Sequence, residues 1–293
     1  MKVSKSECAQ SLTGDDSALE ARDGLILHTR DSMGALERLR KKIEILELAR
    51  RFDGKPYPPG LTRFPGILKG QGFFPGGDGL WRDDPASTNA PPFPVGGIMI
   101  LGNDFGCEDN PDPNNPGFKQ CLARGFEEPR TWSIKDTLIK AGRLGEQCFF
   151  TNAYLGLRAE SPSTGRSPGA KVEAFKAMCR RFLHDQIQEQ KPRLIVCLGH
   201  EPRLLLASMM LPKTHAWNCN CSFKELDSSC DQILQGTLQS NGEIFAPVIL
   251  EIAHPSYAWS TWAQAPRTFR GYRGEDAEVE LLRAAWVMAQ EQS

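Results

Sequence analysis

The chain has 293 residues, 40% of them hydrophobic and 24% charged, with a formal net charge of −1. A chain of this length and composition can bury one large core, which excludes a disordered protein. Its longest apolar runs fall far short of the roughly 20 residues that cross a bilayer, and residues 1–15 lack the apolar core of a signal peptide. We therefore expect a protein that is not secreted and has no membrane partner, located in the cytoplasm, the nucleus or the nucleoid.

Cysteine content and net charge restrict the chemistry further. The nine cysteines are irregularly spaced, and an odd number in a non-secreted chain favours reduced thiols over a disulfide framework. Because the net charge is close to zero, any contact with nucleic acid must come from a local basic patch rather than from the molecule as a whole.

Residues 1–95 are predicted to form an N-terminal extension docked on the main body. Within it, residues 32–52 carry apolar side chains at helical spacing, with charges between them, which predicts a helix. Residues 53–94 are crowded with glycine and proline, which is typical of ordered loops without long elements. We assign no chemistry to this extension.

From residue 96 to residue 293 the pattern changes to short apolar strands that alternate with helical segments. The predicted strands are 98–101, 148–151, 194–198 and 248–252, and the predicted helices are 131–141, 170–190, 201–209 and 275–290. This alternation predicts an α/β domain with three α/β/α layers around a central four-stranded parallel sheet. The polar, cysteine-bearing segment 211–241 is interpreted as an insertion before the last strand.

Polar or turn-forming residues follow each predicted strand, and in open α/β sheets ligands bind at the carboxyl ends of the strands. We therefore expect these endings to meet in one cleft. A carboxylate there can orient water, an amide can pair with an imide edge, and an imidazole can donate to a departing oxygen. The endings are Gly102-Asn103-Asp104, Asn152, Gly199-His200 and His254-Pro255-Ser256.

In their order along the chain, these segments resemble the motifs of the uracil-DNA glycosylase superfamily. Segment 100–104 resembles its first motif, segment 149–153 its middle strand with a base-reading Asn, and segment 194–199 its intervening strand and glycine turn. His254-Pro255-Ser256 is similar to its second motif. The resemblance covers about residues 96–290. No single motif is decisive, and their ordered combination carries the inference.

The resemblance implies a reaction and a role for each residue. The enzyme would flip a deaminated base such as uracil out of DNA and hydrolyse its N-glycosidic bond without a cofactor. Asp104 and His254 would be catalytic: Asp104 would hold water and stabilise the positively charged sugar, and His254 would donate to the departing base. The substrate would be bound by Gly102, Asn103, Asn152, Ser256 and a stacking aromatic, for which Phe126 is the first candidate and Phe118 the second.

The chain departs from the family pattern at several positions. Where the most active branch has Pro and then Tyr after its acidic residue, this chain has Phe105 and Gly106. Since that Tyr excludes the methyl group of thymine, we expect a looser pocket, which Gly106→Tyr should narrow. The family's second motif is usually followed by a Leu that acts as a wedge and fills the stack vacated by the flipped base. That Leu is missing here, and Tyr257, Trp259 or Trp262 would replace it. One branch carries an iron–sulfur cluster on four cysteines; here only Cys8 lies near the start, so we expect no cluster.

Simpler interpretations stand beside these roles. Asp104 could cap a turn after its strand, Asn152 could bridge backbone groups, and Phe126 could fill a core edge. His254 could be a buried, hydrogen-bonded core histidine. A zinc site on His215, Cys219, Cys221 and Cys230 has non-standard spacing, so we favour reduced thiols and no metal.

A basic and aromatic segment after the second motif is the candidate DNA-contacting surface. Arg267, Arg270 and Arg273 alternate there with Phe269 and Tyr272, a pattern suited to backbone contacts with interleaved stacking. A solvated turn before the last helix is the alternative. Two competing functions also stay open: a superfamily member that binds damaged or single-stranded nucleic acid without cleaving it, and a hydrolase of free nucleosides. We expect a monomer.

Overall fold

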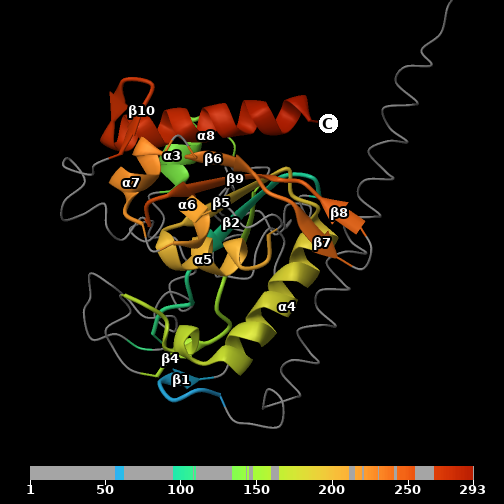
Figure 1. Cartoon of the computed structure of the whole chain (residues 1–293). Coiled ribbons are helices and arrows are strands. Elements are labelled where there is room, and N and C mark those ends of the chain that lie inside the picture. Colours follow the sequence, from blue (N-terminus) through green and yellow to red (C-terminus); the bar gives the residue numbers. More distant parts are fainter. Residues whose placement is uncertain are drawn as a thin grey trace, which may run out of the picture.

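A five-stranded sheet forms the centre of the protein (Figure 1). The computed structural model describes residues 57–62, 95–107, 109, 134–142, 144, 148–159, 165–210, 215–219, 221–229, 231–240, 243–254 and 267–292. The strand order is β3-β2-β5-β9-β6. These strands are β3 (Cys148–Asn152), β2 (Ile98–Gly102), β5 (Leu194–Leu198), β9 (Val248–Ile252) and β6 (Ile233–Gln235).

Four of these strands run parallel, as the apolar runs predict. Strands β3, β2, β5 and β9 pair in parallel register, and each is buried along all five of its residues. Burial on both faces explains why their sequences are almost continuously apolar. Two of the predicted strands, β5 and β9, begin and end where expected, and β2 and β3 are each one residue longer.

The sheet itself is mixed, which corrects the prediction of a purely parallel sheet of four strands. The additional strand β6 pairs antiparallel with β9 at the sheet edge. It belongs to segment 211–241 and has only three residues, none of them fully buried. So short a strand gives no periodic apolar signal in the sequence.

Helices cover both faces of the sheet. One face carries α4 (Glu173–Gln190) and α5 (His200–Ala207), and the other carries α3 (Ile134–Lys140) and α8 (Gly274–Glu291). Alternate strand residues supply the two cores: Met99, Phe149 and Ile195 face α4 and α5, whereas Ile98, Phe150 and Val196 face α3 and α8. The three-layer α/β/α architecture is therefore confirmed.

The remaining elements are short. Segment 211–241 contains α6 (His215–Asn218), α7 (Phe223–Ser228) and β7 (Leu238–Ser240), which pairs with β8 (Glu243–Phe245). A hairpin of β10 (Thr268–Phe269) and β11 (Tyr272–Arg273) precedes α8. A 3-10 turn, Pro168–Lys171, leads into α4.

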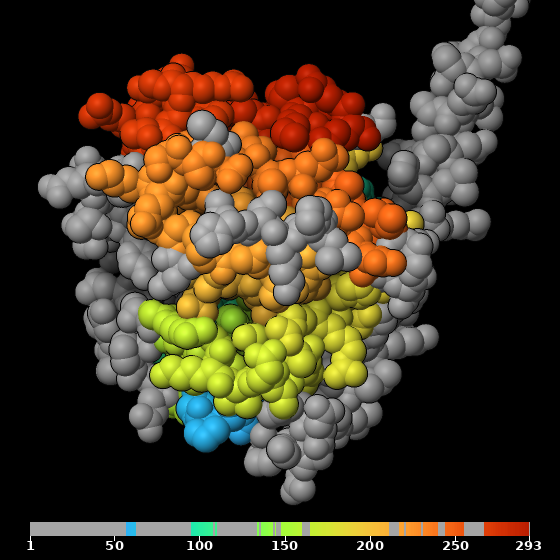
Figure 2. Space-filling model, in the orientation of Figure 1, coloured from blue at the N-terminus to red at the C-terminus, as the bar shows by residue number. Residues whose placement is uncertain are grey.

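Part of the N-terminal extension packs on the main body. Strand β1 (Leu61–Thr62) pairs antiparallel with β4 (Leu157–Arg158), and Leu61 belongs to one of the two cores. Figure 2 shows β1 in blue against the yellow-green residues at the foot of the molecule, opposite the red α8. The helix predicted over residues 32–52 and most of the predicted loops lie outside the described residues, and the boundary at residue 95 stays a prediction.

Candidate active site

Asn152 is held at the sheet end by a close approach of two strands. It is the register partner of Gly102 on the neighbouring strand, and a Cβ added to Gly102 would lie 2.2 Å from the Asn152 Oδ1. Backbone N–H groups of Ala153 and Tyr154 donate to the carbonyl oxygens of Gly102 and Asn103, at 2.8 and 2.9 Å. The two strand exits thus stay joined, and Gly102 makes room for the side-chain amide of Asn152, a residue that is only 6% exposed.

Asn103 fixes the loop that faces this exit. Its Nδ2 donates to the Gly165 carbonyl at 3.2 Å. Its Oδ1 is buried and makes no hydrogen bond within the part of the chain that the structure describes. The Asn103 side-chain oxygen is therefore a buried hydrogen-bond acceptor next to the strand end.

Asp104 is buried in an ion pair that the sequence did not predict. Its Oδ2 accepts from the Arg158 Nε at 2.8 Å, and the Asp104 and Arg158 side chains are 4% and 6% exposed. Its Oδ1 accepts from the backbone N–H of Gly106 at 3.1 Å, so the carboxylate does cap a turn, as the simpler interpretation has it. Burial raises the pKa of Asp104, while the charge of Arg158 and the Gly106 N–H lower it.

Arg158 is the site residue that sequence reasoning missed. It ends the two-residue strand β4, where no motif or periodicity marks it. Besides Asp104, its guanidinium contacts the Gly165 carbonyl, with 2.6 Å between Nη2 and the oxygen. Since its own backbone N–H donates to the Gly106 carbonyl at 2.7 Å, the loop after β2 and the segment after β3 are locked together by backbone and side chain.

His254 follows β9 and contacts the glycine turn after β5. A Cβ on Gly199 would lie 3.6 Å from the His254 Cβ, and the Gly199 N–H donates to the Ile252 carbonyl at 2.7 Å. Burial, together with the positive charge of Arg158, lowers the pKa of His254 to about 4. His254 is thus neutral at pH 7, and the charge of Arg158 acts on both Asp104 and His254.

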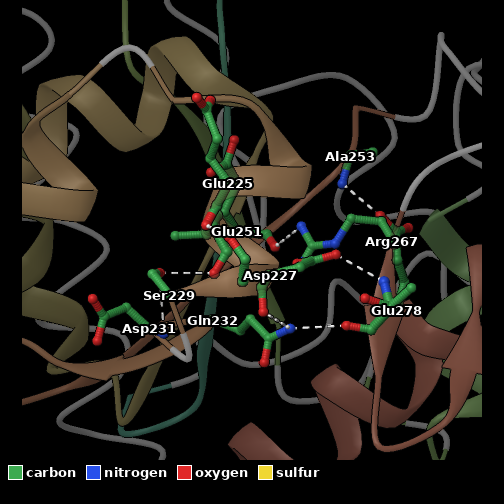
Figure 3. Close-up of polar contacts among 12 residues, drawn as sticks. Glu225, Asp227, Ser229, Asp231, Gln232, Glu251, Ala253, Arg267 and Glu278 are labelled. Carbon is green, nitrogen blue, oxygen red and sulfur yellow. Dashed lines mark hydrogen bonds and ion pairs between the residues drawn. The ribbon is translucent and has the colours of Figure 1, made fainter.

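A buried polar network supports the exit of β9 (Figure 3). The Glu278 carboxylate on α8 accepts from the Ala253 N–H, directly before His254, at 2.9 Å. Arg267 donates to the Glu251 carbonyl at 3.1 Å and forms an ion pair with Asp227, also at 3.1 Å. Burial raises the pKa values of Glu251 and Glu278 to about 7.

The predicted DNA contact of Arg267 is wrong in this arrangement. Its side chain is fully buried, and its guanidinium lies 4.6 Å from the centre of the Phe223 ring. A cation so enclosed stabilises the interior and does not reach a phosphate. Arg270 and Arg273 are exposed on the β10–β11 hairpin, with the Arg270 guanidinium 5.0 Å from the Phe269 ring centre.

The backbone conformation of Gly106 changes how the Gly106→Tyr substitution must be interpreted. Its φ is +70°, in the left-handed region that favours glycine. A tyrosine there would strain the turn that holds Asp104, so Gly106→Tyr is not a clean test of pocket width. The proposed narrowing must be introduced at another position.

Several predicted residues lie outside the described residues. They are the stacking candidates Phe126 and Phe118, the substrate-binding candidate Ser256, the wedge candidates Tyr257, Trp259 and Trp262, and Cys8 and Cys230. Of the zinc candidates, Cys219 and Cys221 are placed, and no three or more metal-binding side chains gather among the described residues.

The fold and these contacts define an α/β protein with an amide, a buried carboxylate and a neutral imidazole at the carboxyl ends of the parallel strands of a mixed sheet. A family model for the uracil DNA glycosylase superfamily matches residues 114–275, which include Asn152 and His254 and begin after Asp104. The chain belongs to the uracil DNA glycosylase superfamily. No curated protein matches it. Membership supports a glycosylase-like function on DNA in general, because the superfamily generally hydrolyses N-glycosyl bonds.

Among the described helices, none has the length and apolar character to cross a membrane.

Proposed function

We propose that this protein is a DNA repair glycosylase that hydrolyses the N-glycosidic bond of uracil, or of a related deaminated base, flipped out of DNA. The observation that carries the proposal is that Asn152, Asp104 and neutral His254 follow the carboxyl ends of parallel strands in one sheet, with the charge of Arg158 acting on Asp104 and His254. Superfamily membership supports the same chemistry.

Asn152 is the base-reading residue of this proposal. In a uracil complex its Oδ1 accepts from the imide N–H and its Nδ2 donates to the neighbouring carbonyl. Cytosine presents an amino donor where the Asn152 amide also donates, so it is rejected. The amide is buried beside Gly102, which restricts the directions in which it can point, and discrimination between the two bases requires such restriction.

His254 and Asp104 act on the bond that breaks. The glycosidic bond cleaves with its electron pair leaving on the base, and neutral His254 donates a hydrogen bond to the base oxygen that gains charge. Asp104, whose carboxylate is held in place by Arg158 and Gly106, stabilises the positive sugar and holds the water that attacks it. Arg158 opposes the effect of burial on the pKa of Asp104, although burial has the larger effect and the pKa is raised.

The test is scission of uracil-containing and normal oligonucleotides after alkaline treatment. We expect scission at uracil alone, reduced about 10²-fold or more by Asn152→Ala or His254→Gln, as for the loss of one transition-state donor. Lys171→Ala, an exposed change in the turn before α4, is the matched control and should leave the rate unaltered. Equal scission at all bases would exclude reading by Asn152.

The ion pair of Asp104 favours one alternative, a superfamily member that binds altered or single-stranded nucleic acid without cleaving it. A carboxylate already bound by an arginine and a backbone N–H has less capacity to activate water. Specific binding of the uracil oligonucleotide with no scission would support this alternative and contradict the proposed reaction. The monomeric state and the cellular location stay predictions.

A further inference from the structure

Two cysteines in segment 211–241 share one buried arginine. Cys219 and Cys221 are both reduced and half-buried, separated by a single residue between α6 and α7. The Arg203 guanidinium on α5 donates to the Cys221 Sγ at 3.1 Å. Its Nη2 also donates to the carbonyl oxygens of Cys219 and Cys221, each at 3.2 Å. Cys219 and Cys221 are therefore both held against the same buried positive charge.

This environment gives the two thiols different reactivities. The Arg203 guanidinium lies at hydrogen-bond distance from the Cys221 sulfur, which places a positive charge beside the negative charge that an attacking sulfur carries, so we assign Cys221 as the attacking group. The pKa of Cys219 is raised, first because its thiol shares a hydrogen bond with Cys221. The buried Cys179, whose pKa burial raises to about 12, has no comparable access to solvent and is expected to be inert.

We propose that Cys219 and Cys221 form a dithiol site that is reversibly oxidised to a disulfide by small-molecule disulfides such as glutathione disulfide. The Cys221 thiolate attacks one sulfur of glutathione disulfide, which forms a mixed disulfide and releases one glutathione thiolate. Cys219, after losing its proton to solvent, attacks the Cys221 sulfur, which releases the second glutathione. The protein loses two electrons, and one glutathione disulfide becomes two glutathiones.

The geometry of the chain permits this bond. A disulfide needs Cα atoms about 4.4–6.8 Å apart, and two residues span at most about 7 Å when fully extended. The spacing of the two cysteines is therefore within the reach of a disulfide. Because closure across a single intervening residue forms a small, strained ring, we expect a labile disulfide that thiols reduce readily.

Oxidation of Cys219 and Cys221 would also affect the candidate active site through the contacts of Arg203. Arg203 forms a buried ion pair with Glu251 on β9, with 2.9 Å between Nε and Oε2, and its Nη2 lies 2.5 Å from the His200 Nδ1. Glu251 precedes His254 by three residues, and His200 follows Gly199, which contacts His254. We expect slower base excision in the oxidised protein. This consequence, unlike the disulfide itself, rests on the proposed function.

Peptide mass spectrometry of the full chain tests the site directly. Cleavage after Lys213 and Lys224 releases residues 214–224, which hold both thiols and exclude Cys230. After treatment with glutathione disulfide, this peptide should lose two hydrogen atoms and resist alkylation, and dithiothreitol should restore both thiols. Cys230→Ser should behave like the unaltered chain.

Single variants then assign the two roles. Cys219→Ser should trap one glutathionyl group on Cys221, whereas Cys221→Ser should acquire it on Cys219 about tenfold more slowly, because Arg203 donates to the sulfur of Cys221 and to the backbone carbonyl of Cys219. Peptide 214–224 retaining two alkylatable thiols, a disulfide from either cysteine to Cys230, or faster reaction at Cys219 would each overturn the proposal.

Activity measurements separate this inference from the proposed function. If the disulfide forms and uracil excision falls at least about threefold in an oxidant-dependent manner that Cys219→Ser abolishes, the site regulates the reaction. If the disulfide forms in a protein with no excision activity, the proposed function fails and the redox site stands. If the disulfide forms and excision is unaffected, the coupling through Arg203 is refuted.

Discussion

At the scale of single residues, the site depends on a glycine whose importance lies in the space that it leaves. A Cβ at position 102 would lie 2.2 Å from the Asn152 Oδ1, and side-chain carbon does not approach oxygen so closely. The Asn152 amide therefore occupies the space that a side chain at position 102 on the neighbouring strand would fill.

We expect Gly102→Ala to lower the unfolding free energy by about 1–3 kcal/mol, as other overpacked cores do, and to displace the Asn152 amide. In the background of Asn152→Ala, which removes the clashing oxygen, the same substitution should cost much less. Urea unfolding of the four proteins of this double-mutant cycle measures the coupling. Equal costs in both backgrounds would show that the two residues do not interact.

Arg158 is the residue that couples Asp104 to His254. Arg158→Gln leaves the buried Asp104 carboxylate without its cation, and we expect a loss of about 3–5 kcal/mol in unfolding free energy. Adding Asp104→Asn should recover much of that loss. Arg166→Gln, which removes a half-exposed partner of Glu201, is the control and should have little effect.

The same substitution should also change a titration. Burial and, after it, the charge of Arg158 lower the pKa of His254 to about 4, so Arg158→Gln should raise that pKa part of the way toward its ordinary value. An NMR titration of the His254 ring measures this shift. An unchanged midpoint would mean that the Arg158 charge does not act on His254.

At the scale of elements, α8 supports the end of β9 through one carboxyl group. Burial raises the pKa of Glu278 from its ordinary 4.5 to about 7. The folded protein therefore holds a proton between these pH values that the unfolded chain releases, and stability from this group is full below pH 4.5 and is lost as the pH rises through 7.

Glu278→Gln cannot titrate and keeps an oxygen that can accept from the Ala253 N–H. The difference in unfolding free energy between this variant and the unaltered protein should shift in favour of the variant by about 1–3 kcal/mol from pH 4.5 to pH 8. Denaturant unfolding at the two pH values gives this difference. Glu280→Gln, on the same helix and paired with Arg283 at its surface, should show no comparable change with pH.

At the scale of the whole molecule, a net charge of −1 leaves any attraction to DNA to local groups. With Arg267 buried, the exposed Arg270 and Arg273 of the β10–β11 hairpin are the remaining candidates from the predicted patch. The hairpin leads directly into α8, whose Glu278 supports the strand that precedes His254, so it lies at the site end of the sheet.

We expect Arg270→Ala with Arg273→Ala to weaken DNA binding equally for uracil-containing and normal strands. The slope of log affinity against log salt should fall by about 2 in magnitude, one for each phosphate that the protein no longer neutralises. Fluorescence anisotropy at several salt concentrations measures the slope. Arg283→Ala, farther along α8, is the control, and a slope unchanged by the double substitution would exclude the hairpin from the interface.

The sequence alone determined the layers of the fold and the order of the strand ends. Short, mostly apolar runs that alternate with helical segments are typical of parallel strands buried on both faces by helices, so β2, β3, β5 and β9 were predictable from local pattern. The same pattern placed Asp104, Asn152 and His254 at the carboxyl ends, since that end of each strand is fixed by chain direction.

Tertiary structure alone decided which charged groups meet. The ion pair between Asp104 and Arg158 joins residues 54 positions apart, and the burial of Arg267 depends on its ion pair with the distant Asp227. Neither pairing leaves a periodic signal, because a single long-range contact imposes no repeat on the chain. Local sequence therefore records the direction and burial of each element, whereas the partner of a buried charge is settled only when the elements pack.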